Sequence, residues 1–169
     1  VFDWTDPSKP FEIASFDRGP VDSTRLVSGG SWSAYWYNGA IFSSEIARGM
    51  DIAELVPGQY LTQNEIDAAR TVKWDYLNGQ GQPQIVCPPS FSLAKAYVDQ
   101  LERSKCLSSG RISSIRQSIA GAERANGPTR ANALSQLSTQ IGTEAQSCDQ
   151  KKILLLQKAL NDLGRMIVS

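Results

Sequence analysis

Residues 32–56 constrain the fold of this chain more than any other stretch, because they combine alternating side chains with tight turns. Residues 32–37 alternate as an extended strand does, with Trp32, Ala34 and Trp36 on one face and Ser33, Tyr35 and Tyr37 on the other. Asn38 and Gly39 follow directly, and this pair strongly indicates a two-residue hairpin, since a type I′ turn needs positive φ at both central residues. Arg48-Gly49 can make a second turn, and Pro57 ends the last strand. The stretch predicts a three-stranded antiparallel meander, which is the core of a propeller blade.

A smaller β segment precedes this meander. Residues 1–4 and 11–16 have strand-like alternation, and the residues between them have turn chemistry with two prolines. Residues 18–31 hold three Gly and one Pro and predict a loop. Residues 52–57 can be laid over residues 1–6 as a second alternating run that ends in a turn. This similarity indicates an internal repeat.

The hydrophobic period becomes helical after Thr62. Thr62 and Glu65 fit a capping box, and the helix that begins there should carry its apolar face as far as Tyr76. Four more helices are predicted at about 91–105, 110–124, 129–146 and 150–168, the last with Asp149 as its N-cap. Their short connections favour antiparallel neighbours that bury their apolar faces in a bundle.

These patterns together predict the fold class α+β, an antiparallel meander followed by a helical extension and bundle. The expected organisation is a propeller-blade-like meander at 1–57, an incomplete blade by its length, then a helix and linker at 58–89. A four-helix, bundle-like region would occupy 90–169.

The absence of histidine is the strongest negative feature of the sequence. It excludes Ser-His-Asp and Cys-His catalysis and histidine metal ligands within this chain. The 17 basic residues equal the 17 acidic ones, so charge gives no reason to expect nucleic acid or an anionic membrane as a partner. No apolar run approaches the length of a membrane span. We predict no catalytic residue, no metal site and no cofactor here.

The three cysteines leave at least one thiol without a partner inside the chain. Cys106 and Cys148 end two helices that would run parallel in an up-down-up bundle, so both should lie at the same end. We predict a disulfide between Cys106 and Cys148, with two free thiols as the alternative. Cys87 is expected to be a packed thiol, because no histidine is present to activate it.

The stretch SWSAYWYNGAIFSSEIARGMDIAELV at 31–56, together with 1–17 and 61–69, resembles the C-terminal part of bacterial LVIVD-repeat proteins. The segment FDWTDPSKPFEIASFD at 2–17 is similar to the end of that family's repeat, with Thr5 where Ser is usual. The resemblance covers residues 1–105, and the last three helices match only in general character. It implies a secreted or cell-surface β-propeller, but no catalytic residues.

About 57 residues cannot close a propeller, which needs at least about four blades. The resemblance therefore implies that upstream blades of the same protein, or another copy, are partners of this chain. The chain also begins without Met and without a signal peptide, so we expect it to be a processed or truncated piece of a longer protein.

The candidate ligand site consists of aromatic and amide side chains of the predicted hairpin: Trp32, Tyr35, Trp36, Tyr37 and Asn38. Amphipathic rings suit a sugar or a peptide. The alternative, which the repeat favours, is that these rings fill the space between neighbouring blades. A polar group near the second turn, with Glu45 and Arg48 as a simple ion pair, is a weaker candidate. Asp3, Asp6 and Asp17 match no calcium loop, and turn capping accounts for Asp6.

The expected function is a non-enzymatic, secreted or surface-attached binding or scaffold module, with a protein or a glycan as its ligand. Two alternatives stay open. The chain could be the C-terminal part of a propeller hydrolase or oxidoreductase whose active site lies on missing upstream blades. The bundle could also be a partner-recognition or assembly domain.

Overall fold

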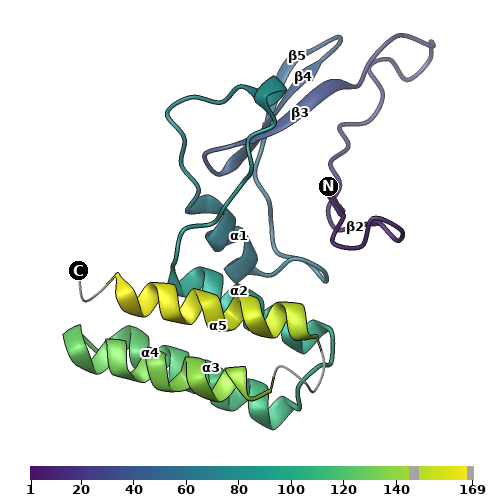
Figure 1. Cartoon of the computed structure of the whole chain (residues 1–169). Coiled ribbons are helices and arrows are strands. Elements are labelled where there is room, and N and C mark those ends of the chain that lie inside the picture. Colours follow the sequence, from purple (N-terminus) through teal and green to yellow (C-terminus); the bar gives the residue numbers. More distant parts are fainter. Residues whose placement is uncertain (145–148, 167–169) are drawn as a thin grey trace. The chain divides into compact units, whose positions relative to one another are not determined.

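The computed structural model describes residues 1–144 and 149–166, which divide into two compact units, Val1–Val86 and Cys87–Ser169. The first unit holds two small antiparallel sheets and a short helix, and the second holds four helices (Figure 1). The predicted α+β fold class, a meander followed by a helical bundle, is confirmed. The helix and linker predicted at 58–89 belong mostly with the strands in the first unit.

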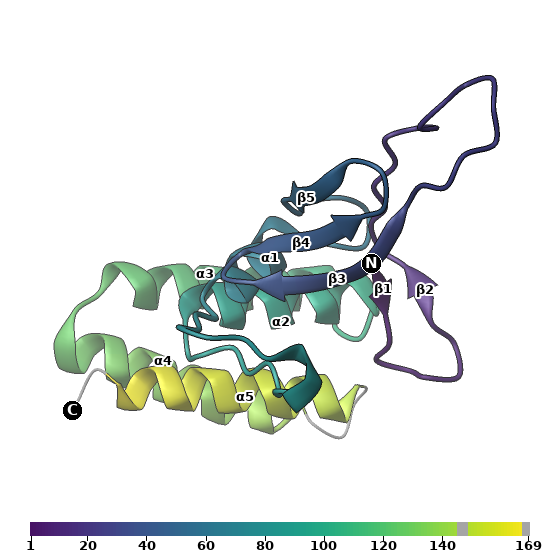
Figure 2. The same cartoon turned by 90° about the horizontal axis from the view of Figure 1, so that it is seen from above.

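The meander has the predicted order. Strands β3 (Ser31–Tyr37), β4 (Ala40–Glu45) and β5 (Gly49–Ala53) pair antiparallel in sequence order (Figure 2). The turn between the first two strands has φ of 51° at Asn38 and 103° at Gly39, as a turn with two left-handed central residues requires. Gly49 begins β5 with φ of 93°. The two turn signals in the sequence therefore place both hairpins correctly.

The strands differ from the prediction in two respects. β3 contains a β-bulge, because Ser31 pairs with Glu45 while Ser33 pairs with the adjacent Ser44. One extra residue, Trp32, therefore interrupts the expected alternation at the start of the strand. β5 also ends at Ala53, earlier than the predicted end at residue 56.

A separate two-stranded sheet precedes the meander. β1 (Phe2–Asp3) pairs antiparallel with β2 (Phe11–Glu12), so the strands predicted at 1–4 and 11–16 exist but are shorter than expected. Asp6 explains the turn between them, since its carboxylate accepts from the amide and the hydroxyl of Ser8. These bonds favour the ionised carboxylate and lower the pKa of Asp6.

Helix α1 (Gln63–Arg70) begins with the predicted capping box. The Glu65 amide donates to the Thr62 hydroxyl oxygen at 3.3 Å, and the Thr62 amide donates to the Glu65 carboxylate at 2.7 Å. The prediction that this helix continues to Tyr76 is wrong, because it ends at Arg70. Further along, the Asn38 side chain bonds both the amide and the carbonyl of Trp74. These two backbone groups are therefore not free to continue the helix. A single 3-10 turn, η1 (Gly79–Gly81), follows.

The second unit is a four-helix bundle of α2 (Phe91–Arg103), α3 (Ser109–Arg124), α4 (Gly127–Gly142) and α5 (Gln150–Arg165). α2 and α4 each pack against both α3 and α5. Three of the helices begin at a side-chain cap, Ser90, Ser108 and the predicted Asp149. The buried faces form one continuous core of small and branched apolar side chains: Ala94, Val98, Leu101, Ile112, Ile115, Ile119, Ala122, Leu134, Leu137, Ile141, Ile153, Leu156, Leu160 and Leu163.

One buried charge is held inside this bundle. The Asp99 side chain is only 7% exposed, and its carboxylate accepts from Arg116 Nη2 at 2.7 Å. Arg116 also donates to both carboxylate oxygens of Glu102. The two carboxylates raise the pKa of Arg116, so the guanidinium stays charged and joins α3 to α2.

Candidate functional site

Several aromatic rings line an open cavity on one face of the meander. This cavity, which we call the aromatic hollow, has a volume of about 400 Å³, within the range of small-molecule sites. Two strands and the segment after α1 supply its walls: Tyr35, Tyr37, Phe42, Asp75, Tyr76, Leu77 and Gly79.

The strand wall of the hollow follows from the hairpin register. Tyr35 and Tyr37 are two residues apart, so they share a face of β3. Tyr35 lies directly opposite Phe42 across the β3–β4 ladder, which brings Phe42 to the same face. The rings of Tyr37 and Phe42 meet edge to face, with centroids 6.1 Å apart and planes at 67°. The Asn38–Gly39 turn therefore fixes which three rings lie together.

The opposite wall is held in place by Asn38. Its Nδ2 donates to the Trp74 carbonyl at 2.9 Å, and its Oδ1 accepts from the Trp74 amide at 2.8 Å. Lys73 Nζ donates to the Asn38 carbonyl at 2.9 Å. The Tyr37 hydroxyl donates to the Asp75 carbonyl at 3.4 Å. These four bonds attach the chain at 73–75 to the hairpin, and Tyr76 follows directly.

Gly79 allows the far end of this wall to approach the strand. A Cβ atom at Gly79 would lie 2.5 Å from Cε1 of Tyr35, which is closer than carbon atoms pack. The main chain at Gly79 therefore lies against the ring edge of Tyr35, and no larger residue fits there without movement. Asn78 positions this turn, because its side chain accepts from the Gln80 amide at 3.0 Å.

The hollow is open to solvent and carries a single charge. Tyr35 is 48% exposed and Tyr76 is 79% exposed, so both rings present surface that a ligand can cover. Among the described residues that line the hollow, Asp75 alone carries a formal charge. Within the described part of the chain, its carboxylate makes no hydrogen bond or ion pair.

The structure brings together only part of the predicted ligand site. Tyr35 and Tyr37 line the hollow, and Asn38 lies beside it as a positioning residue. Trp36 pairs with Ile41 and belongs to the other face of the sheet. Trp32 occupies the bulge and is 76% exposed. The sequence reasoning missed Phe42 and Tyr76, although pairing outward from the Asn38–Gly39 turn gives the Tyr35–Phe42 contact directly.

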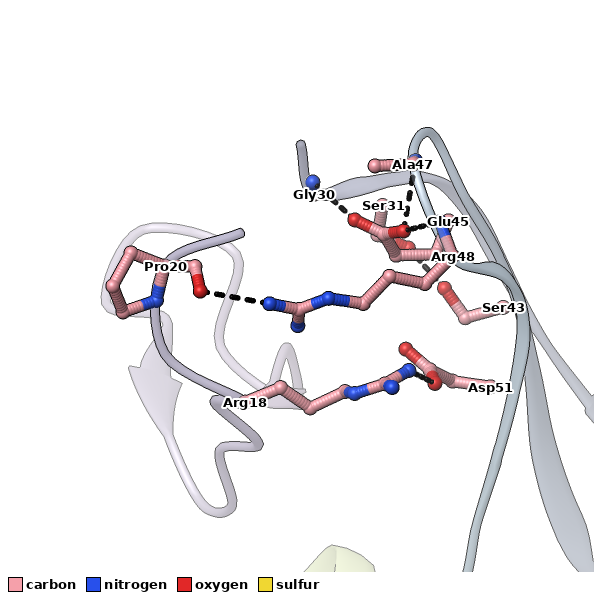
Figure 3. Close-up of polar contacts among 9 residues, drawn as sticks. All are labelled: Arg18, Pro20, Gly30, Ser31, Ser43, Glu45, Ala47, Arg48 and Asp51. Carbon is pink, nitrogen blue, oxygen red and sulfur yellow. Dashed lines mark hydrogen bonds and ion pairs between the residues drawn. The ribbon is translucent and has the colours of Figure 1, made fainter. Parts of the chain in front are cut away.

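A second cavity of about 690 Å³ lies between the other face of the sheet and the loop at 14–30. Its polar groups are used to hold this loop (Figure 3). Arg18 forms an ion pair with Asp51, and Arg48 Nη2 donates to the Pro20 carbonyl at 2.8 Å. The hydroxyl groups of Ser31 and Ser43 bond across the strands.

Glu45 has a turn-forming role in this second cavity. Its carboxylate accepts from the Gly30 amide at 2.8 Å, from the Ala47 amide at 2.9 Å and from the Arg48 amide. The bond from Gly30 is the main cause that lowers the pKa of Glu45. The carboxylate is thus occupied by backbone donors, and the Arg48 guanidinium reaches Pro20.

The acidic residues considered for calcium have local partners. Asp3 accepts from the Thr5 amide and Asp17 accepts from the Gly19 amide, both at 2.7 Å, in the pattern that caps turns. In the parts of the chain that the structure describes, no group of three acidic or sulfur ligands is close enough to hold a metal ion.

The two cysteines among the described residues, Cys87 and Cys106, belong to the unit Cys87–Ser169. Cys87 is a free thiol, and burial raises its pKa, which disfavours the reactive thiolate. Cys106 Sγ accepts from the Asp149 amide, with 3.1 Å between sulfur and nitrogen. Asp149 follows Cys148 in the chain. Cys148 itself lies outside the described residues, so the Cys106–Cys148 disulfide stays a prediction.

No protein-family model, curated protein or solved structure matches this chain. The resemblance to LVIVD-repeat proteins therefore rests on the sequence alone. Among the helices that the structure describes, none has the length and apolar character needed to cross a membrane.

Proposed function

We propose that this chain is a non-enzymatic binding module that holds its ligand in the aromatic hollow. One observation carries the proposal: four aromatic rings from β3, β4 and the segment after α1 line an open cavity of about 400 Å³. Rings that are partly exposed offer a large contact area at little cost in conformational entropy. A sugar ring or a protein side chain fits such a site.

The setting that we propose is a secreted or cell-surface repeat protein of the LVIVD type. The edges of the meander support this setting, because within the described sheet β3 and β5 pair only with β4. An outer strand with unpaired amides and carbonyls is suited to pairing with a further strand. Upstream blades of the same protein, or another copy, would supply such strands and would leave this chain as a terminal blade.

Large apolar side chains on this unit give further support for partners. Trp4, Phe16 and Val56 are each more than three-fifths exposed, at 63%, 64% and 73%. A partner that covers these side chains would remove their apolar surface from water. The alternative, an enzyme whose active site lies elsewhere in a longer protein, is tested by the precursor sequence. An upstream cluster of His and acidic residues would favour the enzyme, and several similar repeats would favour the propeller.

The binding proposal is tested with matched aromatic variants. A panel of soluble glycans and peptides is titrated against the protein while amide chemical shifts are followed by NMR. We expect ligands to shift the amides of Tyr35, Tyr76 and Gly79. Tyr76→Ala should abolish this response, whereas Trp32→Ala, which removes an equally exposed ring outside the hollow, should leave it unchanged. Equal loss of binding in both variants would reject the hollow as the site.

A second pair of variants changes the shape of the hollow without removing a ring. Gly79→Ala forces a new methyl group against Tyr35, while Gly81→Ala, in the same 3-10 turn, has no atom within 4 Å of the new carbon. We expect ligand affinity to fall about tenfold in Gly79→Ala, which corresponds to about 1.4 kcal/mol, and to stay at the wild-type value in Gly81→Ala. Unchanged affinity in Gly79→Ala would contradict the proposal.

A further inference from the structure

The residues that line the aromatic hollow give it a negative electrostatic character. Aromatic faces carry partial negative charge, and Asp75 adds a full negative charge at the same cavity. None of the described residues that line the hollow is a cation, and the ammonium of Lys73, in the neighbouring part of the same segment, is bonded to the Asn38 carbonyl at 2.9 Å. The walls therefore favour a ligand that is positively charged and apolar at its surface.

We propose that the hollow binds a small molecule through a trimethylammonium group. This inference rests on the proposed function, because it names the ligand class of the same site. Three methyl groups give such a cation an apolar envelope that aromatic rings can contact, and its charge is attracted by the ring faces. Tyr35, Tyr37, Phe42 and Tyr76 supply the rings that line this open site.

Asp75 distinguishes a quaternary ammonium ligand from a neutral one. The Asp75 carbonyl already accepts from the Tyr37 hydroxyl at 3.4 Å, so its main chain is fixed against the strand wall. Its carboxylate has no partner among the described residues, and a bound cation would provide one. An exposed ion pair contributes little binding free energy by itself. The rings should therefore supply most of the affinity, and the carboxylate should add to the preference for a cation over a neutral ligand.

The same charge argues against a phosphorylated carrier of this group. In phosphocholine, a phosphate lies a few bonds from the ammonium, and it would be repelled by the Asp75 carboxylate. We therefore infer a ligand of choline type, with a hydroxyl or another neutral body, in preference to a phosphocholine lipid headgroup.

The experiment compares choline with 3,3-dimethylbutan-1-ol, in which a carbon atom replaces the nitrogen and the charge is lost at constant shape. Both are titrated against the full chain, with amide shifts at Tyr35, Tyr76 and Gly79 as the readout. We expect choline to bind about tenfold more tightly than the neutral alcohol. Phosphocholine should bind more weakly than choline.

Variants separate the rings from the carboxylate. Tyr76→Ala should abolish choline binding, and this ring is exposed enough that its loss should not unfold the protein. Asp75→Asn should weaken choline binding about threefold and leave the neutral alcohol unaffected. Asp67→Asn, which removes the same charge from α1 away from the hollow, should bind choline as the wild type does.

The outcomes distinguish this inference from the proposed function. Equal binding of choline and its neutral analogue at the hollow would overturn the cation proposal and would leave a binding site in place. Tighter binding of phosphocholine than of choline would overturn the preference for a neutral body and point to a lipid headgroup. Absence of any shift at Tyr35, Tyr76 and Gly79 with choline, glycans and peptides would overturn both proposals.

Discussion

The bundle buries its apolar side chains, whereas the strand unit leaves many of them exposed. In the bundle, the apolar faces of four helices close on one another and form a continuous buried core. In the unit at Val1–Val86, rings and branched side chains such as Phe2, Trp32 and Ile52 remain largely exposed. The bundle is thus held mainly by apolar burial, while the strand unit depends more on turns and side-chain bonds to the backbone.

This difference can be measured, because each unit has its own spectroscopic signal. All four tryptophans, Trp4, Trp32, Trp36 and Trp74, lie in the strand unit. Most helical residues lie in the bundle, so circular dichroism at 222 nm reports chiefly on it. Unfolding followed by both signals should therefore give two curves that respond to different substitutions.

The largest effect that we expect concerns the predicted disulfide. A bridge between Cys106 and Cys148 closes a loop of about 42 residues, which adds about 4 kcal/mol to the stability of the bundle in the chain-entropy model. A reducing agent should then shift the circular dichroism curve in urea and leave tryptophan fluorescence unchanged. Cys106→Ser should remove the response to the reducing agent. Recovery of separately alkylated Cys106 and Cys148 peptides from a non-reduced digest would disprove the bridge.

A substitution in the bundle core tests the dependence on burial. Ile115 is fully buried, and Ile115→Ala should lower the free energy of unfolding of the bundle by about 3 kcal/mol through lost contacts and a cavity. Ile52→Ala in β5 removes the same atoms from a side chain that is 60% exposed, and should change stability by less than about 0.5 kcal/mol. Each variant is measured with the signal of its own unit. Similar losses of unfolding free energy for the two variants would contradict the proposed difference in how the units are stabilised.

The strand unit should be more sensitive to one amide than to its exposed apolar side chains. Asn38→Asp keeps a residue that tolerates positive φ, but it places a carboxylate oxygen where Nδ2 donates to the Trp74 carbonyl. We expect a loss of about 2 kcal/mol in the fluorescence-detected transition. Asn38→Gly, which preserves the turn and removes both side-chain bonds, is the control for the bonds alone. If Asn38→Asp lowers the stability of the strand unit by less than Ile52→Ala does, the bonds from Asn38 to Trp74 do not have this stabilising role.

The smallest effect is a dependence on pH at Glu45. Its pKa is lowered in the folded state, so its contribution to stability is present above the unfolded value of about 4.3 and is lost as the pH falls through the folded value. Glu45→Gln should therefore lower the free energy of unfolding of the strand unit at pH 7. The difference in this free energy between the variant and the wild type should become smaller in acid. Glu12→Gln, which removes a charge from β2, is the charge-matched control. The measurement is fluorescence-detected unfolding from pH 7 to about pH 3.

The same contrast explains which features the sequence predicts. Ile112, Ile115 and Ile119 recur at helical spacing, and all three lie in the bundle core, because local periodicity decides burial when neighbouring helices are joined by short links. The end of α1 at Arg70 follows no such rule. The apolar pattern continues to Tyr76, but the Trp74 backbone is bonded by Asn38, which lies 36 residues earlier in the chain.

The aromatic hollow was half predictable for a related reason. Tyr35 and Tyr37 follow from strand alternation, and Phe42 follows from the register of the two-residue turn. Periodicity predicts that Tyr76 belongs to a helix, so it gives no indication that this ring lines the hollow. The bulge at Ser31 and Ser33 likewise separates Trp32 from the pattern, since a bulge leaves no reliable signal in one sequence.

Asn38 illustrates how one side chain can specify two levels of structure. Its short amide tolerates the left-handed backbone that the hairpin turn requires. The same amide also imitates a peptide group: it offers the Trp74 backbone one acceptor and one donor, as a neighbouring strand would. The residue that forms the hairpin turn therefore also bonds the backbone of a distant segment, in the way that one residue of a neighbouring strand does. Local turn chemistry and tertiary assembly are therefore encoded at this position by the same atoms.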